Sequence, residues 1–271
     1  NSDNIVAAVH GKAATPALLA AVDKVAAALD QPKLLGLNKA VEVDRKTSAV
    51  AAQEFATANN LTAGLSGGRG KVVIGAANFP ESQTLAELYK IALGAAGFDA
   101  SVLQSTNREL YEPALERGEI TVFPEYAATM TEFLNSKVNG ANASPKASGD
   151  INATMAALKE LGTKQGLVFG TPSSASDQNA FATTKGVADK YGLKTLSDFA
   201  AKCSGKASVL AGPPECPQRP FCQPGLKNTY GIEFGQFFQA DAGGPQSKTA
   251  LRNGSATLSL VFSSDSSLQA A

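Results

Sequence analysis

The sequence has very few of the side chains on which most catalytic and metal centres depend. Among its 271 residues there are one histidine, no tryptophan and three cysteines. Because His10 is the only histidine, the sequence offers few residues from which a metal cluster or a Ser-His-Asp triad could be built. We interpret His10 as a structural side chain at a strand end. Asp265 and Glu125 could be imagined as an acid and a base, but no nucleophile accompanies them. We therefore expect no enzyme, no metal and no cofactor.

The sequence also lacks any excess of charge and any long apolar run. It has 24 basic and 24 acidic residues, which gives a formal net charge of zero. Without a basic stripe, nucleic acid and anionic membrane surfaces are poor partners. No apolar run approaches the length of a membrane span, so we expect none. Hydrophobic residues make up 44% of the chain, enough to bury a large core.

Two of the three cysteines lie close together in a proline-rich stretch. Cys216 and Cys222 stand in "PPECPQRPFCQPG", and a zinc site would need more ligands at closer spacing. In an extracellular protein this stretch predicts a small disulfide loop that leaves Cys203 as a free thiol. A bridge that involves Cys203 is the alternative.

The glycine-rich stretch "LSGGRGKVVIGAANFPESQ" raises the question of a nucleotide-binding loop. A P-loop needs a shorter spacing than that from Gly64 to Gly70, and a hydroxyl residue after the lysine, where Val72 follows Lys71. The apolar strand pattern also comes after the glycines instead of before them. We interpret residues 61–70 as a flexible linker.

The residues before the linker predict one strand followed by helices. Residues 4–12 have a strand pattern, and Thr15 and Pro16 are a typical N-cap and first helical residue. Apolar residues then recur at helical spacing, which predicts one buried face: Leu18, Val22, Val25 and Leu29. Further helices are expected over 32–41 and 48–60.

After the linker, strand and helix patterns alternate. The first series runs from "KVVIGAA" to "LVFGTP", and a second runs from "NAFATTKGVADKYG" to "ATLSLVFSS". This order predicts an α/β protein with mostly parallel sheets and helices on both faces. Ligands of such sheets bind at the carboxyl ends of the strands, which here are "NFPES", "STNRE", "PEYAAT", "SSASDQN", "GPPE" and "FSSDS".

Several of these stretches resemble one family. "KVVIGAANFPESQTLAELYKIALGAAG", "ERGEITVFPEYAAT", "DKYGLKTLSDFA" and "GPPECPQRPFCQPGLKNTYGIEF" resemble the substrate-binding proteins of osmoprotectant ABC importers for glycine betaine, choline and carnitine, in their actinobacterial style. The resemblance implies a type II two-lobed periplasmic-binding-protein fold that closes on a small solute. It also implies an extracytoplasmic receptor, expected to be a monomer, with an ABC permease as partner.

The first sixty residues resemble the C-terminal end of the same family, so the chain looks circularly permuted, naturally or by engineering, for example as a sensor. The resemblance implies that residues 1–60 complete lobe 1 and that 61–70 join the old termini. Residues 71–172 then form lobe 1 and 173–271 form lobe 2. The strand near 4–12 is expected at an edge of either lobe.

The resemblance also implies a set of ligand-binding residues. Aromatic faces attract quaternary ammonium groups: Tyr126 matches a cage tyrosine, and Phe79 and Phe262 are further candidates. Arg108 and Arg219 are candidates for a ligand carboxylate. The full set is Asn78, Phe79, Glu81, Arg108, Tyr126, Thr129, Asn179, Arg219, Phe262, Ser264 and Asp265.

One departure leaves the ligand open. Asn179 stands where the family often has a tyrosine, and the chain has only five tyrosines. The expected ligand is a small quaternary ammonium cation or zwitterion such as a betaine. An amino acid or another small amine is the alternative. A scaffold or adhesion protein is a further reading, which a binding screen would separate from the others.

Overall fold

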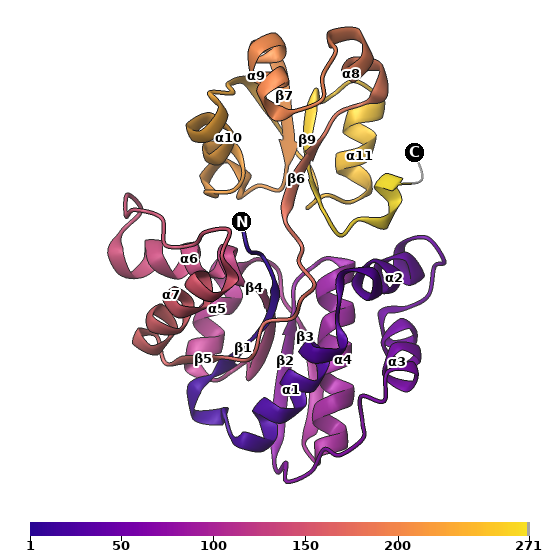
Figure 1. Cartoon of the computed structure of the whole chain (residues 1–271), viewed down its shortest axis with the longest axis vertical. Coiled ribbons are helices and arrows are strands. Elements are labelled where there is room, and N and C mark those ends of the chain that lie inside the picture. Colours follow the sequence, from indigo (N-terminus) through magenta and orange to yellow (C-terminus); the bar gives the residue numbers. More distant parts are fainter. Residues whose placement is uncertain (270–271) are drawn as a thin grey trace. The chain divides into compact units, whose positions relative to one another are not determined.

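The computed structural model describes residues 1–269, which form two compact units (Figure 1). Unit 1 contains residues 1–177 and 264–269, and unit 2 contains residues 178–263. The chain therefore crosses between the units twice, after Asp177 and after Ser263. The sequence suggested a division near residue 172 and placed the last residues in the second lobe, whereas residues 264–269 return to unit 1.

Unit 1 is built on a five-stranded sheet in the order β3-β2-β4-β1-β5. Its strands are β1 (Ile5–His10), β2 (Lys71–Ala76), β3 (Asp99–Gln104), β4 (Val122–Tyr126) and β5 (Leu167–Phe169). Its helices are α1 (Pro16–Ala28), α2 (Gln31–Glu42), α3 (Ser48–Ala58), α4 (Pro80–Ala96), α5 (Arg108–Arg117), α6 (Ala127–Asn139) and α7 (Ile151–Lys164), with the short 3-10 turns η1 (Gly11–Ala13) and η3 (Ser266–Gln269).

Strand β1 lies inside this sheet and not at its edge, where the sequence led us to expect it. It runs antiparallel to both β4 and β5, whereas β3, β2 and β4 are parallel. Ile5 and Val9 pack into the core that contains α1 and α4, and Val6 and Ala8 pack into the core that contains α6 and α7. The unbroken apolar run "IVAAVH" fits a strand that is covered on both faces.

The helix boundaries in unit 1 follow local sequence signals. Thr15 accepts a hydrogen bond from the backbone N–H of Leu18, and Pro16 is the first residue of α1, as predicted. The predicted buried face of α1 and the residue after it is confirmed. Helices α4 and α5 end before Gly97 and Gly118, whose φ angles of 110° and 77° lie in the left-handed region that favours glycine.

Unit 2 is built on a four-stranded sheet in the order β6-β9-β7-β8. Its strands are β6 (Asn179–Ala182), β7 (Gly205–Gly212), β8 (Phe234–Gln239) and β9 (Leu258–Phe262). Its helices are α8 (Lys185–Tyr191), α9 (Leu196–Cys203), α10 (Gln223–Tyr230) and α11 (Pro245–Arg252), with the 3-10 turn η2 (Cys216–Gln218).

Strand β8 is an element that the sequence did not predict. Its residues, "FGQFFQ", do not alternate between apolar and polar, and they are half-buried or exposed. It pairs only with β7 in the described sheet, in parallel and with an irregular register. A short edge strand of this kind gives a weak pattern because it has no fully buried face.

The core of unit 2 contains a disulfide. Cys216 and Cys222 are bonded to each other, and both are buried against residues such as Phe199 and Leu226. Cys203, at the end of α9, is half-buried and is not part of this bond. The bond closes the proline-rich loop that precedes α10.

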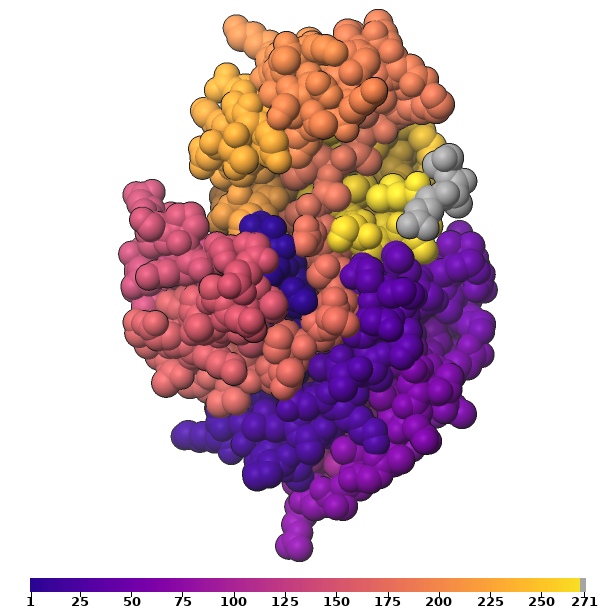
Figure 2. Space-filling view, viewed as in Figure 1, coloured from indigo at the N-terminus to yellow at the C-terminus, as the bar shows by residue number. Residues whose placement is uncertain are grey.

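The N-terminal residues and the linker have clear places in unit 1. The hydroxyl of Ser2 donates to the carbonyl oxygen of Ser148 and to the hydroxyl of Thr154, and Figure 2 shows the first residues seated against this part of the surface. Residues 65–69 form neither helix nor strand, and β2 begins directly after them. No helix within residues 1–269 is long and apolar enough to cross a membrane.

Candidate functional site

Two predicted aromatic residues meet at the carboxyl ends of neighbouring strands in unit 1. Strands β2 and β4 are parallel, so their carboxyl ends lie at the same edge of the sheet. Asn78 and Phe79 follow β2 and precede α4, whereas Tyr126 is the last residue of β4. The ring centroids of Phe79 and Tyr126 are 6.4 Å apart, with 29° between the ring planes.

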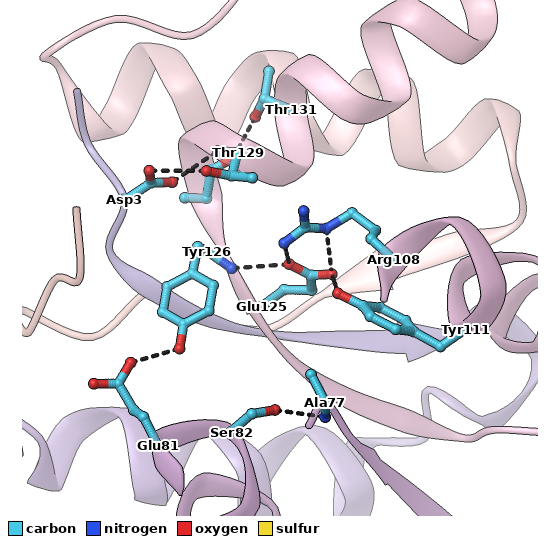
Figure 3. Close-up of polar contacts among 11 residues, drawn as sticks. Asp3, Ala77, Glu81, Ser82, Arg108, Tyr111, Glu125, Tyr126, Thr129 and Thr131 are labelled. Atoms are coloured by element: carbon cyan, nitrogen blue, oxygen red, sulfur yellow. Dashed lines mark hydrogen bonds and ion pairs between the residues drawn. The ribbon is translucent and has the colours of Figure 1, made fainter. Parts of the chain in front are cut away.

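A buried carboxylate, Glu81 in the first turn of α4, lies at the centre of the polar contacts around Tyr126. Its Oε1 accepts from the Tyr126 hydroxyl at 2.5 Å, as Figure 3 shows. Its Oε2 accepts from Asn38 Nδ2 at 2.7 Å and from Ser264 Oγ at 2.6 Å. Glu81 is only 6% exposed, so one carboxylate joins α2, α4, β4 and the residue after the second crossing.

A second buried carboxyl, Asp177, faces Glu81. Burial raises the pKa of Asp177 well above its usual value, and the neighbouring Glu81, with which it shares a hydrogen bond, raises it further. Two buried carboxyls in contact share one proton, because two negative charges there repel each other. The raised pKa therefore favours the neutral, hydrogen-bond-donating form of Asp177.

Burial and the two neighbouring carboxyls keep the Tyr126 hydroxyl protonated. Burial raises the pKa of Tyr126 well above its usual value, and Glu81 and Asp177 raise it further. A protonated hydroxyl is a donor, which matches its bond to Glu81. The ring therefore presents a neutral aromatic face next to a negative carboxylate.

Arg108, predicted as a partner of a ligand carboxylate, is engaged by a carboxylate of the protein itself. Its Nε and Nη2 donate to Glu125 Oε1 and Oε2 at 2.9 and 2.8 Å, and both side chains are buried. Glu125 also accepts from the Tyr111 hydroxyl and, at 3.2 Å, from the backbone N–H of Tyr126 (Figure 3). Burial acts to lower the pKa of Arg108, but Glu125 outweighs it and the pKa is raised. The pair holds β4 and α5 together.

Thr129, at the start of α6, contacts a residue from the beginning of the chain. Asp3 accepts from the backbone N–H of Thr129 at 2.7 Å and from its hydroxyl at 2.9 Å. Burial raises the pKa of Asp3, although the bonds from Thr129 act in the opposite direction. The Thr129 hydroxyl is thus used within unit 1 to fix the segment that leads into β1.

The two predicted residues after the second crossing have different roles. The backbone N–H of Ser264 donates to Asp177 Oδ1 at 3.3 Å, and its hydroxyl donates to Glu81. Asp265 accepts from the backbone N–H and the hydroxyl of Ser267 at 2.9 and 2.7 Å. Ser264 therefore belongs to the group of contacts around Glu81, whereas the contacts of Asp265 with Ser267 cap the turn η3.

Two of the predicted residues of unit 2, Asn179 and Phe262, lie at the same end of its sheet. Asn179 begins β6 and faces Phe262, the last residue of β9, across the strand pair. Asn179 Nδ2 donates to the carbonyl oxygen of Phe221 at 3.0 Å. Arg219 lies within the same disulfide-closed loop as Phe221. Arg219 therefore stands shortly before Phe221, the residue that Asn179 contacts.

Four residues of unit 1 with a large part in these contacts were missing from the expected set. Asp3 and Asn38 lie in the N-terminal segment, which the sequence pattern presented only as structural support. Asp177 stands in the quoted strand end "SSASDQN", and Glu125 directly precedes Tyr126. For Asp177 and Glu125 the available signal was position, since both carboxylates stand in quoted strand ends with chosen residues. Within residues 1–269, no group of three or more acidic, histidine or cysteine side chains could hold a metal ion.

Two α/β units joined by two chain crossings define the type II periplasmic-binding-protein fold, a class of solute-binding proteins. Residues 70–271 match the family model OpuAC, described as the substrate binding domain of the ABC-type glycine betaine transport system. The chain belongs to this family, whose members are substrate-binding domains and not enzymes. The resemblance seen in the sequence is thereby confirmed, whereas the match itself says nothing about residues 1–69.

The chain is also similar to individual proteins. It is 26% identical over 192 residues to the glycine-betaine-binding protein of Pseudomonas aeruginosa, an alignment that covers 66% of this chain and 58% of that relative. The crystal structure of a glycine betaine/carnitine/choline ABC transporter protein is 20% identical, with a TM-score of 0.45, over 70% of this chain and 68% of the other. For apo YehZ of Escherichia coli the values are 21%, 0.43, 71% and 69%.

Proposed function

We propose that the chain binds a small quaternary ammonium solute, either a cation or a zwitterion of the betaine type. The observation that carries the proposal is the pairing of the Tyr126 ring with the Glu81 carboxylate in unit 1. Among the described residues, the hydrogen-bond partners of Glu81 are hydroxyls, an amide and the neutral Asp177, and none is a cation. A ligand cation at this ring would supply the missing positive charge.

The chemistry of a quaternary ammonium group suits such a place. It has no N–H to donate, so it is held by aromatic faces and by nearby negative charge. The rings of Phe79 and Tyr126 provide two aromatic groups 6.4 Å apart. A primary amine would instead seek hydrogen-bond acceptors, and Glu81 already shares hydrogen bonds with four side chains of the protein. The geometry of unit 1 therefore favours a methylated ammonium over an amino acid.

The opposite end of a zwitterionic ligand needs a donor for its carboxylate. Arg108 is a weak candidate, because Glu125 takes two of its donors in a buried pair. Arg219, Asn179 and Phe262, which the sequence resemblance suggested, are kept as candidate ligand-binding residues. Asn78, Thr129, Ser264 and Asp265 are retained as candidates with lower weight, because the last three are used in contacts within unit 1.

Isothermal titration with glycine betaine, choline, carnitine, proline and glycine tests the proposal. We expect binding of at least one quaternary ammonium solute and none of proline or glycine. Tyr126→Ala should weaken that binding by about tenfold or more, because it removes a ring face. Tyr89→Phe, a change to a buried tyrosine of α4, is the matched control and should leave the affinity unchanged. Binding of amino acids alone would overturn the proposal.

We also propose that the chain acts in import, as the extracytoplasmic receptor that delivers its solute to an ABC permease. The family membership supports this role. The chain spans 58% of the length of the curated relative that it matches, so the whole protein's transport activity stays a proposal. Solute uptake by a cell that depends on this receptor, compared with uptake in its absence, is the direct test.

We further propose that the order of segments is circularly permuted with respect to the family. The family match begins at residue 70, yet β1 of the preceding segment lies in the middle of the unit 1 sheet. A reordered chain with residues 70–271 before residues 1–69 should therefore fold and bind the same solute. Deletion of residues 1–60 should give an insoluble or loosely packed chain, and cooperative folding with full binding after that deletion would contradict the proposal.

A further inference from the structure

The two chain crossings are tied to one another inside unit 1. Asp177 is the last residue before the first crossing, and Ser264 is the first residue after the second. The backbone N–H of Ser264 donates to Asp177 Oδ1 at 3.3 Å. In unit 2 the next residues are tied as well, since Gln178 and Ser263 exchange two hydrogen bonds of 2.8 and 2.9 Å. The two crossing segments are therefore hydrogen-bonded to each other at both of their ends.

Both residues of unit 1 that end the crossings reach the same carboxylate. Ser264 Oγ donates to Glu81 Oε2 at 2.6 Å, and the neutral carboxyl of Asp177 shares a hydrogen bond with Glu81. Hydrogen bonds to an ionised acceptor are roughly twice as strong as neutral ones. Glu81 thus links both crossings to α4 through hydrogen bonds.

The other carboxylate oxygen of Glu81 accepts a hydrogen bond from the hydroxyl of Tyr126. Because the Tyr126–Glu81 bond is 2.5 Å long and buried, a shift of the ring moves a donor of the carboxylate to which both crossings are bound. Asn38 holds Oε2 from the side of α2 at 2.7 Å. The carboxylate therefore has little freedom to absorb a shift of the ring by itself.

We propose that Glu81 is a positioning residue that couples the side chain of Tyr126 to both chain crossings. The proposal rests on the proposed function in so far as Tyr126 is taken to contact the ligand. Through this coupling, occupation of the ring would alter how firmly both crossings are held on unit 1. Glu81 acts through its neighbours and is not assigned a contact with the ligand.

Two variants isolate the coupling. Glu81→Gln keeps the shape of the side chain but replaces one acceptor oxygen with a donor, so at least one of its bonding partners loses its acceptor. Tyr126→Phe removes only the hydroxyl on Oε1 and leaves the donors on Oε2 in place. Glu132→Gln is the matched control: Glu132 is a buried carboxylate of α6 that accepts from the backbone N–H groups of Lys146 and Ala147, both at 2.6 Å.

Hydrogen exchange of the ligand-free protein, followed by mass spectrometry of peptides that cover residues 174–180 and 261–267, is the test. We expect Glu81→Gln and Tyr126→Phe each to raise exchange in both peptides by about tenfold relative to the rest of unit 1. Glu132→Gln should leave that ratio unchanged. The proposal is overturned if Tyr126→Phe leaves both peptides unchanged, or if Glu81→Gln accelerates exchange evenly throughout unit 1, as a purely structural residue would.

The measurement needs no ligand, so it separates this proposal from the proposed function. If both variants loosen the crossings but the wild-type protein binds no quaternary ammonium solute, the coupling is supported and the proposed ligand class fails. If the wild-type protein binds such a solute and Tyr126→Phe leaves the crossing peptides unchanged, the ligand class is supported and the coupling is overturned.

Discussion

Both units are of the α/β class, but different kinds of interaction stabilise the interior of each unit. Every buried aspartate, glutamate and arginine among the described residues lies in unit 1, including Asp3, Glu81, Arg108, Glu125 and Asp177. The buried polar side chains described in unit 2 are serines, and its core contains the only disulfide that the described residues form. Unit 1 thus contains buried charged side chains, whereas unit 2 contains a buried disulfide.

The difference follows from what each unit has to connect. Unit 1 joins segments from the beginning, the middle and the end of the chain, and its buried charges lie where those segments meet, as in the contacts between Asp3 and Thr129 and between Glu81 and Ser264. Unit 2 is one continuous segment. Buried charges need specific partners, so they favour a single arrangement of separate segments. A short cross-link is sufficient to fix one loop.

Among the variants that test this comparison, Arg108→Ala is expected to have the largest effect on stability. The substitution leaves Glu125 as a buried carboxylate without its partner, which typically costs about 3–5 kcal/mol of stability. Denaturant unfolding followed by hydrogen exchange in each unit should show that unit 1 unfolds much earlier, with unit 2 little changed. Arg117→Ala, which breaks an exposed pair with Glu119, is the control and should have no measurable effect. An equal loss in both units would break the comparison.

The next largest effect on stability is expected from a change of pH, because several carboxyls of unit 1 have raised pKa values. Burial raises the pKa of Asp3 and Asp177, and it raises that of Glu112 from 4.5 to about 7. The folded state then holds more protons than the unfolded state, so this contribution to stability is present at low pH and is lost as pH rises through the folded values. Unit 1 should therefore lose stability between pH 4.5 and about 7, and Glu112→Gln should flatten that loss.

Unit 2 is the internal control for this pH experiment, because no aspartate, glutamate or arginine is buried in its described residues. Chemical denaturation at a series of pH values, with exchange followed separately in each unit, gives both profiles from the same samples. If unit 2 shows the larger fall across the same range, the assignment of the pH response to buried carboxyls of unit 1 is wrong.

A smaller effect is expected from the disulfide. Cys216 and Cys222 are six residues apart, and release of so short a loop costs about 2 kcal/mol in the chain-entropy account. Reduction, or the double change Cys216→Ser and Cys222→Ser, should lower the thermal midpoint of unit 2 and leave unit 1 in place. Cys203→Ser is the control, since Cys203 lies outside the bond. A shift of unit 1 on reduction would show that the units do not unfold independently.

The smallest effect should be equal in the two units. Thr15 caps α1 in unit 1, and Thr195 caps α9 in unit 2, where Asp198 completes a capping box. Each substitution to alanine should cost about 1 kcal/mol, because a cap is a local interaction. Thermal unfolding of both variants provides the test. A clear difference between them would mean that caps, and not only buried charges, distinguish the units.

The fold could be predicted in large part, because its elements carry local signals. Apolar periodicity, N-caps and terminal glycines indicate α1, α4 and α5, and alternation of strands and helices indicates two α/β units. The place of β1 could not be derived this way. An unbroken apolar strand fits any covered position, and only its pairing with β4 and β5, far along the chain, decides between edge and centre.

The candidate site was less predictable, because partners are chosen in three dimensions. The sequence indicated Tyr126 and Glu81, but not that they bond to each other, and it presented Arg108 as available although Glu125 is seventeen residues away in sequence and bonded to it. Asp3 and Asn38 carry no local signal at all, since short polar side chains ahead of a strand or in a helix are typical of the surface. Their roles depend on contacts across unit 1.

The central position of β1 has a consequence for how the chain is made. Ile5 pairs with Tyr126 and Ala8 pairs with Phe169, so β1 leaves the ribosome long before its partners. At about 5–20 residues per second the strand waits on the order of 10–30 s. During that time a chargeless apolar strand is a template for aggregation. The yield of soluble protein should therefore depend on how fast the chain is translated and on what shields β1, more than on the stability of the finished fold.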